Sequence, residues 1–270
     1  MAEREVRIEG SFELLSQDEW DAYLSVGYFE RLRIDMDALQ VSEGGMPDLK
    51  YPRLAEMINE HNNKVGSVSI TYALCKHYYD RGIPDDPWCI SPGNQGQSVQ
   101  YMPLFQQEHW MRRYWFNYFA DTYYLKLFSI WDSVVEILNH FYGLDYASDL
   151  RLRGKVIKWL ESNSPRVFSL FEDILSDSTY QNALKYRTAA AHGTSPSTVS
   201  NTVKRKNEEV EIVAGVDQSG RPIMKRVKGE VISIEVGEYT HVATIMSNME
   251  AYAVLSGDKI QEVIQLLTKA

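Results

Sequence analysis

The chain contains few of the residues and motifs that define common enzyme classes. Its 270 residues include only two cysteines, Cys75 and Cys89, which are too far apart for a CxxC site and too few for a disulfide framework. No uninterrupted apolar run reaches the ~18 residues that a membrane span needs, and residues 1–7 contain no apolar signal region. We therefore expect a cytoplasmic protein with reduced cysteines and no membrane contact.

Metal and nucleotide motifs are also missing. The six histidines are scattered and form no HExxH pair, and no cysteine lies at ligand spacing. The turn at residues 93–98 lacks the Gly-Lys-Ser/Thr ending of a phosphate loop, and no GxSxG motif of a serine hydrolase is present. The sequence therefore predicts no metal and no cofactor.

Acidic charge is concentrated at the N-terminus. Residues 1–62 hold 14 acidic and six basic side chains, whereas the other 208 residues are close to neutral within a total of −9. Residues 204–228 form a local basic segment, which fits either a groove for a polyanion or a solvated hairpin with ordinary surface charge. The charge argues against a general nucleic-acid coat protein.

Apolar periodicity predicts a helical protein. Helices are expected at about 17–40, 52–62, 66–81, 103–142, 146–163, 165–192 with a break near 176–179, 238–255 and 257–268, with a loop over 84–98. The helix over 103–142 has the clearest stripe, with spacings of four and three residues typical of a bundle: Ala120, Tyr124, Leu127, Trp131, Val134, Leu138 and Phe141.

The period changes to two between residues 208 and 236, around the turn Asp217-Gln218-Ser219-Gly220. This alternation predicts a β-hairpin inserted between helices. We expect an N-terminal helical extension over 1–100, packed on the bundle, and a helical domain over 101–270 that carries the hairpin.

Aromatic residues are dense in the long helix. Tyr114, Trp115, Tyr118 and Tyr123 could form a stacking platform for bases, or they could be buried in the core or in a subunit interface. The position of the helix in a bundle favours burial.

One pair of residues is suited to acid–base chemistry. Arg187 and His192 stand near the end of a predicted helix, separated by Thr188 and three alanines and followed by Gly193. Histidine can exchange a proton near neutral pH, and arginine offers a planar set of donors for phosphate oxygens. Because positions five apart on a helix differ by about 140°, we expect the last turn to unwind at Gly193 so that the pair can converge.

This string resembles the signature of HEPN domains, which is an arginine, a polar residue, three to five further residues and a histidine, often with Ala before the histidine and Gly after it. Tyr186 to Gly193 fits this signature except at Thr188, where the family prefers Asn, Asp or His. The order of a long early helix and a later helix with the motif is similar too, over about residues 103–268. The resemblance implies an all-α helical bundle, here with additional N-terminal helices and the inserted β-hairpin.

The resemblance further implies a metal-independent endoribonuclease whose composite site forms in a homodimer. Arg187 and His192 are then catalytic, with Thr188 and the polar residues Ser129 and Asp132 of the long helix as supporting residues. Lys185 and Tyr186 are candidate substrate contacts. RNA is the expected substrate, and a bacterial toxin or antiviral defence system, with an antitoxin or other partner protein, is the expected setting.

Two alternatives stay open. Thr188 and the acidic N-terminal quarter are compatible with a noncatalytic HEPN-like module that binds RNA or protein. A plain structural helical protein unrelated to HEPN domains would instead enclose His192 in its core. Ser129 and Asp132 also fit a solvated stripe of the long helix, with Ser133 and Glu136.

Overall fold

The computed structural model describes residues 12–35, 50–192, 195–199, 202–235 and 239–268. It divides into one unit made of residues 1–197 and 240–270 and a second made of residues 198–239. The first unit is a helical bundle and the second is a β-hairpin. The predicted all-α fold with an inserted hairpin is confirmed.

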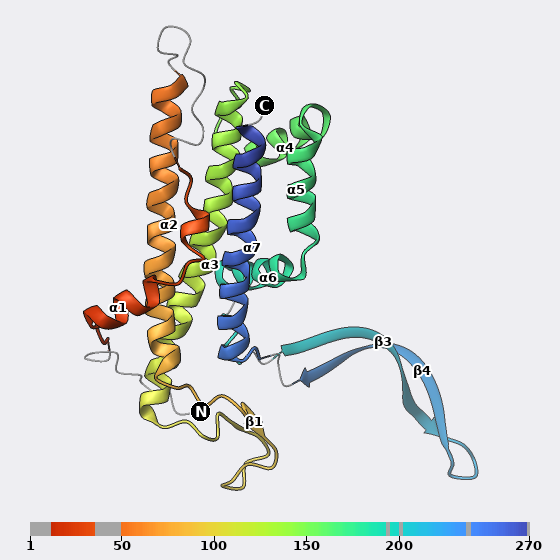
Figure 1. Ribbon diagram of the computed structural model, residues 1–270. Helices are drawn as coiled ribbons and strands as arrows, with labels where there is room; N and C mark the ends of the chain where they lie inside the picture. The colour runs from red at the N-terminus through yellow and green to blue at the C-terminus, as the bar shows by residue number, and fades with distance from the viewer. Residues whose placement is uncertain (1–11, 36–49, 193–194, 200–201, 236–238, 269–270) are drawn as a thin grey trace. The chain divides into compact units, whose positions relative to one another are not determined.

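Three long helices form the centre of the bundle: α2 (Lys50–Asp80), α3 (Gln107–Phe141) and α7 (Val242–Leu267). Figure 1 shows them side by side, and contacts join each of the three to the other two. The predicted stripe of α3 is confirmed, because all of its members except the half-buried Phe141 are buried. The apolar surface removed from water along this stripe stabilises the bundle.

Helix α2 is continuous where two helices were predicted. The sequence Asn62-Asn63-Lys64-Val65-Gly66 looks like a break, but Val65 and Val68 are fully buried on the side of α2 that faces the core. Burial of this apolar face outweighs the weak helix propensity of Asn and Gly. Helix α7 likewise runs through residue 256, where a boundary between two helices was expected.

Three shorter helices follow α3: α4 (Leu152–Asn163), α5 (Pro165–Ser176) and α6 (Ser178–His192). The break predicted near residues 176–179 is confirmed at Asp177, and Pro165 occupies the first turn of α5, where its missing N–H costs nothing. Helix α4 begins six residues later than expected. In Figure 1, α6 runs across the direction of α3 and α7, and it contacts both helices.

The N-terminal segment contains α1 (Gln17–Leu24) and the short 3-10 helix η1 (Glu30–Leu32) in place of one helix over 17–40, of which residues 36–40 lie outside the described residues. A capping box between Ser16 and Glu19 begins α1. His61 of α2 holds η1 in place, because its Nε2 lies 2.8 Å from the Leu32 carbonyl oxygen and its Nδ1 lies 2.8 Å from Ser133 Oγ. Burial lowers the pKa of His61 to about 4, so the ring is neutral at pH 7.

The segment expected as a loop over 84–98 contains a short strand, β1 (Cys89–Ile90). This strand forms a two-residue antiparallel ladder with β2 (Gln100–Tyr101), which follows the segment. Cys75 is buried and Cys89 half-buried, and both are free thiols. Across the described part of the chain, no helix has the combination of length and apolar character that a bilayer span requires.

The division of the chain at residue 100 stays a prediction, because α2, which precedes residue 100, and α3, which follows it, pack along one another.

The second unit is an antiparallel hairpin of β3 (Thr202–Val216) and β4 (Pro222–Glu235). Asp217 stabilises its turn by accepting hydrogen bonds from the backbone N–H groups of Ser219 and Arg221 at 2.8 and 2.9 Å. Arg226 and Glu211 form a cross-strand ion pair at 2.9 Å, so part of the basic segment is neutralised within the hairpin. The side chains of Lys204, Arg205 and Lys206 lie outside the described residues.

Candidate active site

Helix α6 carries the Arg187/His192 pair in its last two turns. The helix begins after Asp177, whose carboxylate accepts a hydrogen bond from the Thr179 backbone N–H at 2.6 Å. This bond satisfies one of the donors that a helix start leaves free.

The expected unwinding of the last turn is wrong, because α6 stays helical as far as His192. Residues 189–191 are alanines, the residue type with the highest helix propensity, and they extend the helix through this turn. Arg187 and His192 therefore project about 140° apart around the helix axis and are separated by about 7.5 Å along it.

The two side chains are accessible. His192 is exposed and Arg187 is half-buried, and neither forms a hydrogen bond or an ion pair with another described residue. Thr188 and Lys185 are exposed on the same helix. The exposure of His192 argues against the alternative of a structural histidine enclosed in the core.

Tyr186 is buried against α3 and anchors α6. Its side chain is 6% exposed, its ring centroid lies 5.4 Å from that of Tyr124 on α3, and its hydroxyl is hydrogen-bonded to the Thr240 side chain. Burial raises the pKa of both tyrosines. Tyr186 therefore has a packing role, and its expected contact with substrate stays a prediction.

The chain that follows the motif is fastened to α3. The Arg113 guanidinium donates a hydrogen bond to the Ser197 carbonyl oxygen, and the Ser197 hydroxyl donates one to Asn117 Oδ1. One turn further along α3, the Asp121 carboxylate accepts a hydrogen bond from the Ser195 side chain. These three residues of α3, spaced four apart, fix the segment that begins three residues after His192.

Asp121 has a perturbed acidity. Burial raises its pKa to about 6, and the hydrogen bond from Ser195 opposes this shift only in part. A carboxyl group whose pKa is raised toward neutral pH is a functional candidate, although buried structural acids show the same shift.

The family model described as HEPN_Cthe2314-like HEPN matches residues 57–247, which is more than half of the chain and includes α3 and α6. The chain belongs to this HEPN family. The resemblance drawn from residues 186–193 is thereby confirmed. Comparison with curated proteins and with solved structures finds no match.

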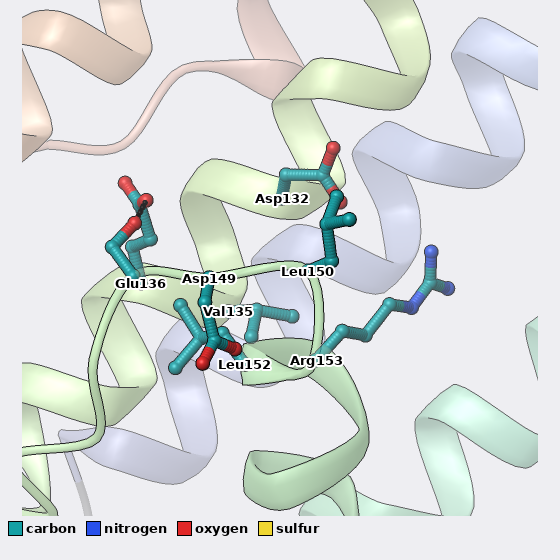
Figure 2. Close-up of a pocket in the computed structure, with 8 residues that line it drawn as sticks. Asp132, Val135, Glu136, Asp149, Leu150, Leu152 and Arg153 are labelled. Atoms are coloured by element: carbon teal, nitrogen blue, oxygen red, sulfur yellow. Dashed lines mark hydrogen bonds between the residues drawn. The ribbon is translucent and has the colours of Figure 1, made fainter.

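In this HEPN bundle, Ser129 and Asp132 lie away from the end of α6. The Ser129 hydroxyl donates a hydrogen bond to the Lys126 carbonyl oxygen of its own helix at 2.6 Å. Figure 2 shows Asp132 on α3 beside the segment that carries Leu150 and Arg153, where a cavity of about 490 Å³ is lined entirely by α3 and residues 148–153. Asp132 is about 16 Å along α3 from Asp121, so the supporting role of Ser129 and Asp132 stays a prediction.

The structure brings two residues that the sequence analysis missed, Asp121 and Asn117, into contact with the segment after His192. A signal for them exists, because Arg113, Asn117 and Asp121 are polar residues spaced four apart and so share one side of the helix. Within the described residues, His, Cys, Asp and Glu form no group of three or more that could hold a metal ion.

Proposed function

We propose that this HEPN protein is a metal-independent endoribonuclease in which His192 and Arg187 are catalytic. The observation that carries the proposal is that both side chains at the end of α6 are accessible and pair with no other residue that the structure describes, within a family-matched bundle. A histidine can exchange a proton near neutral pH, and an accessible arginine can donate hydrogen bonds to phosphate oxygens.

The reaction uses the ribose of the RNA itself. His192 takes the proton of a 2′-hydroxyl, the 2′ oxygen attacks the adjacent phosphorus, and the bond from phosphorus to the 5′ oxygen breaks. The products are a 2′,3′-cyclic phosphate and a 5′-hydroxyl end, whose proton comes from a protonated histidine. Arg187 neutralises the charge on the phosphorane, and DNA is excluded because it lacks the nucleophile.

A second copy of the chain completes this site. Since Arg187 and His192 diverge by about 140° on one helix, a pair of α6 helices brings an arginine and a histidine together more readily than one helix alone. Two copies also provide one histidine as base and another as acid. The proposed active form is therefore a homodimer.

Other residues take supporting roles in the proposal. Lys185 and Thr188 are exposed on α6 and contact substrate phosphates. Asp121, which accepts a hydrogen bond from Ser195 three residues beyond His192, joins Ser129 and Asp132 as a proposed supporting residue of α3. A toxin or antiviral defence setting in the cytoplasm, with an antitoxin or other partner protein, is part of the proposal on the family resemblance alone.

The test is cleavage of a labelled single-stranded RNA in the presence of EDTA. His192→Ala is expected to lower the rate by roughly 10²–10⁴-fold and Arg187→Ala by a comparable factor, whereas Arg166→Ala, at an exposed arginine of α5, leaves it unchanged. The matching DNA should stay intact. Co-expression of the two inactive variants should restore only a small part of the activity, because a mixed dimer regains one arginine and one histidine but still lacks the second histidine.

Persistence of cleavage in both His192→Ala and Arg187→Ala would refute the mechanism. The competing function, a noncatalytic module that binds RNA or protein, is motivated by Thr188 and by the acidic N-terminal quarter. It predicts a pure protein that binds RNA or a partner and leaves RNA intact.

A further inference from the structure

Two tyrosines of α3 are directed away from the core. Tyr114 is 42% exposed and Tyr118 is 55% exposed, one helical turn apart. Their neighbour Tyr123 is fully buried and donates a hydrogen bond to the Met249 carbonyl oxygen at 2.8 Å. The aromatic residues of this helix therefore serve two purposes, and we call Tyr114 and Tyr118 the tyrosine face.

Trp115 holds both rings in position. Its ring centroid lies 5.3 Å from that of Tyr114 and 5.9 Å from that of Tyr118, with interplanar angles of 83° and 84°. Trp115 is itself stacked on Phe119 and on Tyr78 of α2. Tyr118 also makes an edge-to-face contact with Phe119, with ring centroids 5.3 Å apart. The exposed fractions of both tyrosines show that part of each side chain stays accessible beyond these contacts.

The tyrosine face lies on the same side of α3 as Asp121. At 100° per residue, Tyr114 is within about 20° of Asp121 around the axis of α3, and Tyr118 is within about 60°. The two tyrosines are about 10 and 5 Å from Asp121 along the axis. Asp121 in turn contacts Ser195, three residues beyond His192.

We propose that Tyr114 and Tyr118 stack on unpaired bases of the single-stranded RNA that is cut at the proposed site. Rigid exposed aromatic rings bind bases of any sequence through their flat faces, and unpaired RNA presents such bases. Tyr118 has the aromatic residues Trp115 and Phe119 on one side and the polar residues Asn117, Asp121 and Thr122 on the other. The polar side suits a hydrated nucleic-acid contact. The inference rests on the proposed function, since it names how the substrate of that site is held.

Binding is measured on the full chain with His192→Ala, which prevents cleavage, using a fluorescent 12-nucleotide single-stranded RNA and an abasic RNA of the same length. Tyr114→Ala and Tyr118→Ala are each expected to weaken binding of the normal RNA by roughly 5- to 100-fold. The Tyr→Phe variants retain the ring and should bind within about twofold of the parent. Ile70→Ala, at an exposed apolar residue of α2, is the matched control and should change nothing.

The outcomes separate this inference from the catalytic proposal. Loss of affinity in the alanine variants, together with weak binding of abasic RNA by the parent, supports the stacking site even if wild-type protein cleaves no RNA. Unchanged affinity in folded alanine variants overturns it, and so does a parent that binds no RNA. Variants that change the sedimentation of the protein but not RNA binding also overturn it, because the tyrosine face is then a protein contact.

Discussion

At the residue scale, Asp121 shows how burial turns an ordinary carboxyl into a group that titrates near neutral pH. Desolvation destabilises the charged carboxylate of Asp121, and the hydrogen bond from the Ser195 side chain offsets only part of this cost. No local pattern shows this in the sequence, because the acidity depends on which chain segment covers the residue. The polar spacing of Arg113, Asn117 and Asp121 is visible in the sequence, whereas their common partner segment is not.

Asp121→Asn should change the pH dependence of stability. A raised carboxyl pKa means that the native state binds more protons than the unfolded chain between about pH 4 and 6, so this group lowers stability as the pH rises through that range. At pH 7 the variant should be more stable than wild type by on the order of 1–2 kcal/mol, and the difference should vanish near pH 4. Urea unfolding at both pH values measures this. A variant less stable at pH 7 would show that the bond to Ser195 outweighs desolvation.

At the element scale, tertiary contacts decide where helices end. Helix α2 passes through Gly66 because its buried face is continuous, although local propensity favours a break. Helix α7 passes through Gly257, where the close approach of η1 requires the absence of a side chain: a Cβ there would lie 2.9 Å from Arg31 Cβ. The two glycines look alike in sequence and differ in their surroundings.

Alanine substitutions at these glycines should have opposite effects. Gly66→Ala adds a methyl group with no described atom within 4 Å and should raise the free energy of unfolding by about 0.5–1 kcal/mol. Gly257→Ala forces η1 away from α7 and should lower it by about 1–3 kcal/mol. Chemical denaturation of both variants against wild type is the measurement. Equal effects at the two sites would contradict the structure.

At the scale of the whole molecule, the hairpin is an insertion between α6 and α7 that the bundle does not need for closure. The Thr240 N–H donates a hydrogen bond to the Pro196 carbonyl oxygen at 3.0 Å, so the two chain ends that flank the hairpin already meet. The N-terminus of α7 is also held, because the Val242 N–H donates to Asp85 Oδ2 at 2.8 Å. Bundle and hairpin are therefore separable units.

Replacement of residues 199–238 by a short Gly-Ser linker should leave the bundle folded. Loop closure costs only about 0.6 kcal/mol per doubling of length, so the free energy of unfolding should stay within about 2 kcal/mol of wild type. Thermal unfolding followed by the helical circular dichroism signal tests this. Loss of the helical signal would show that the hairpin is part of the cooperative unit.

The sequence by itself determined the fold class, the long stripe of α3, the hairpin and the HEPN signature at residues 186–193, because periodicity, turn chemistry and motif spacing are local properties. Only the tertiary structure decided that α2 and α7 are continuous, that α6 remains helical through His192, and that Asp121 lies beside the segment after the motif. The reason is physical. Burial and desolvation act between segments far apart in the chain, and they override local propensity wherever the two conflict.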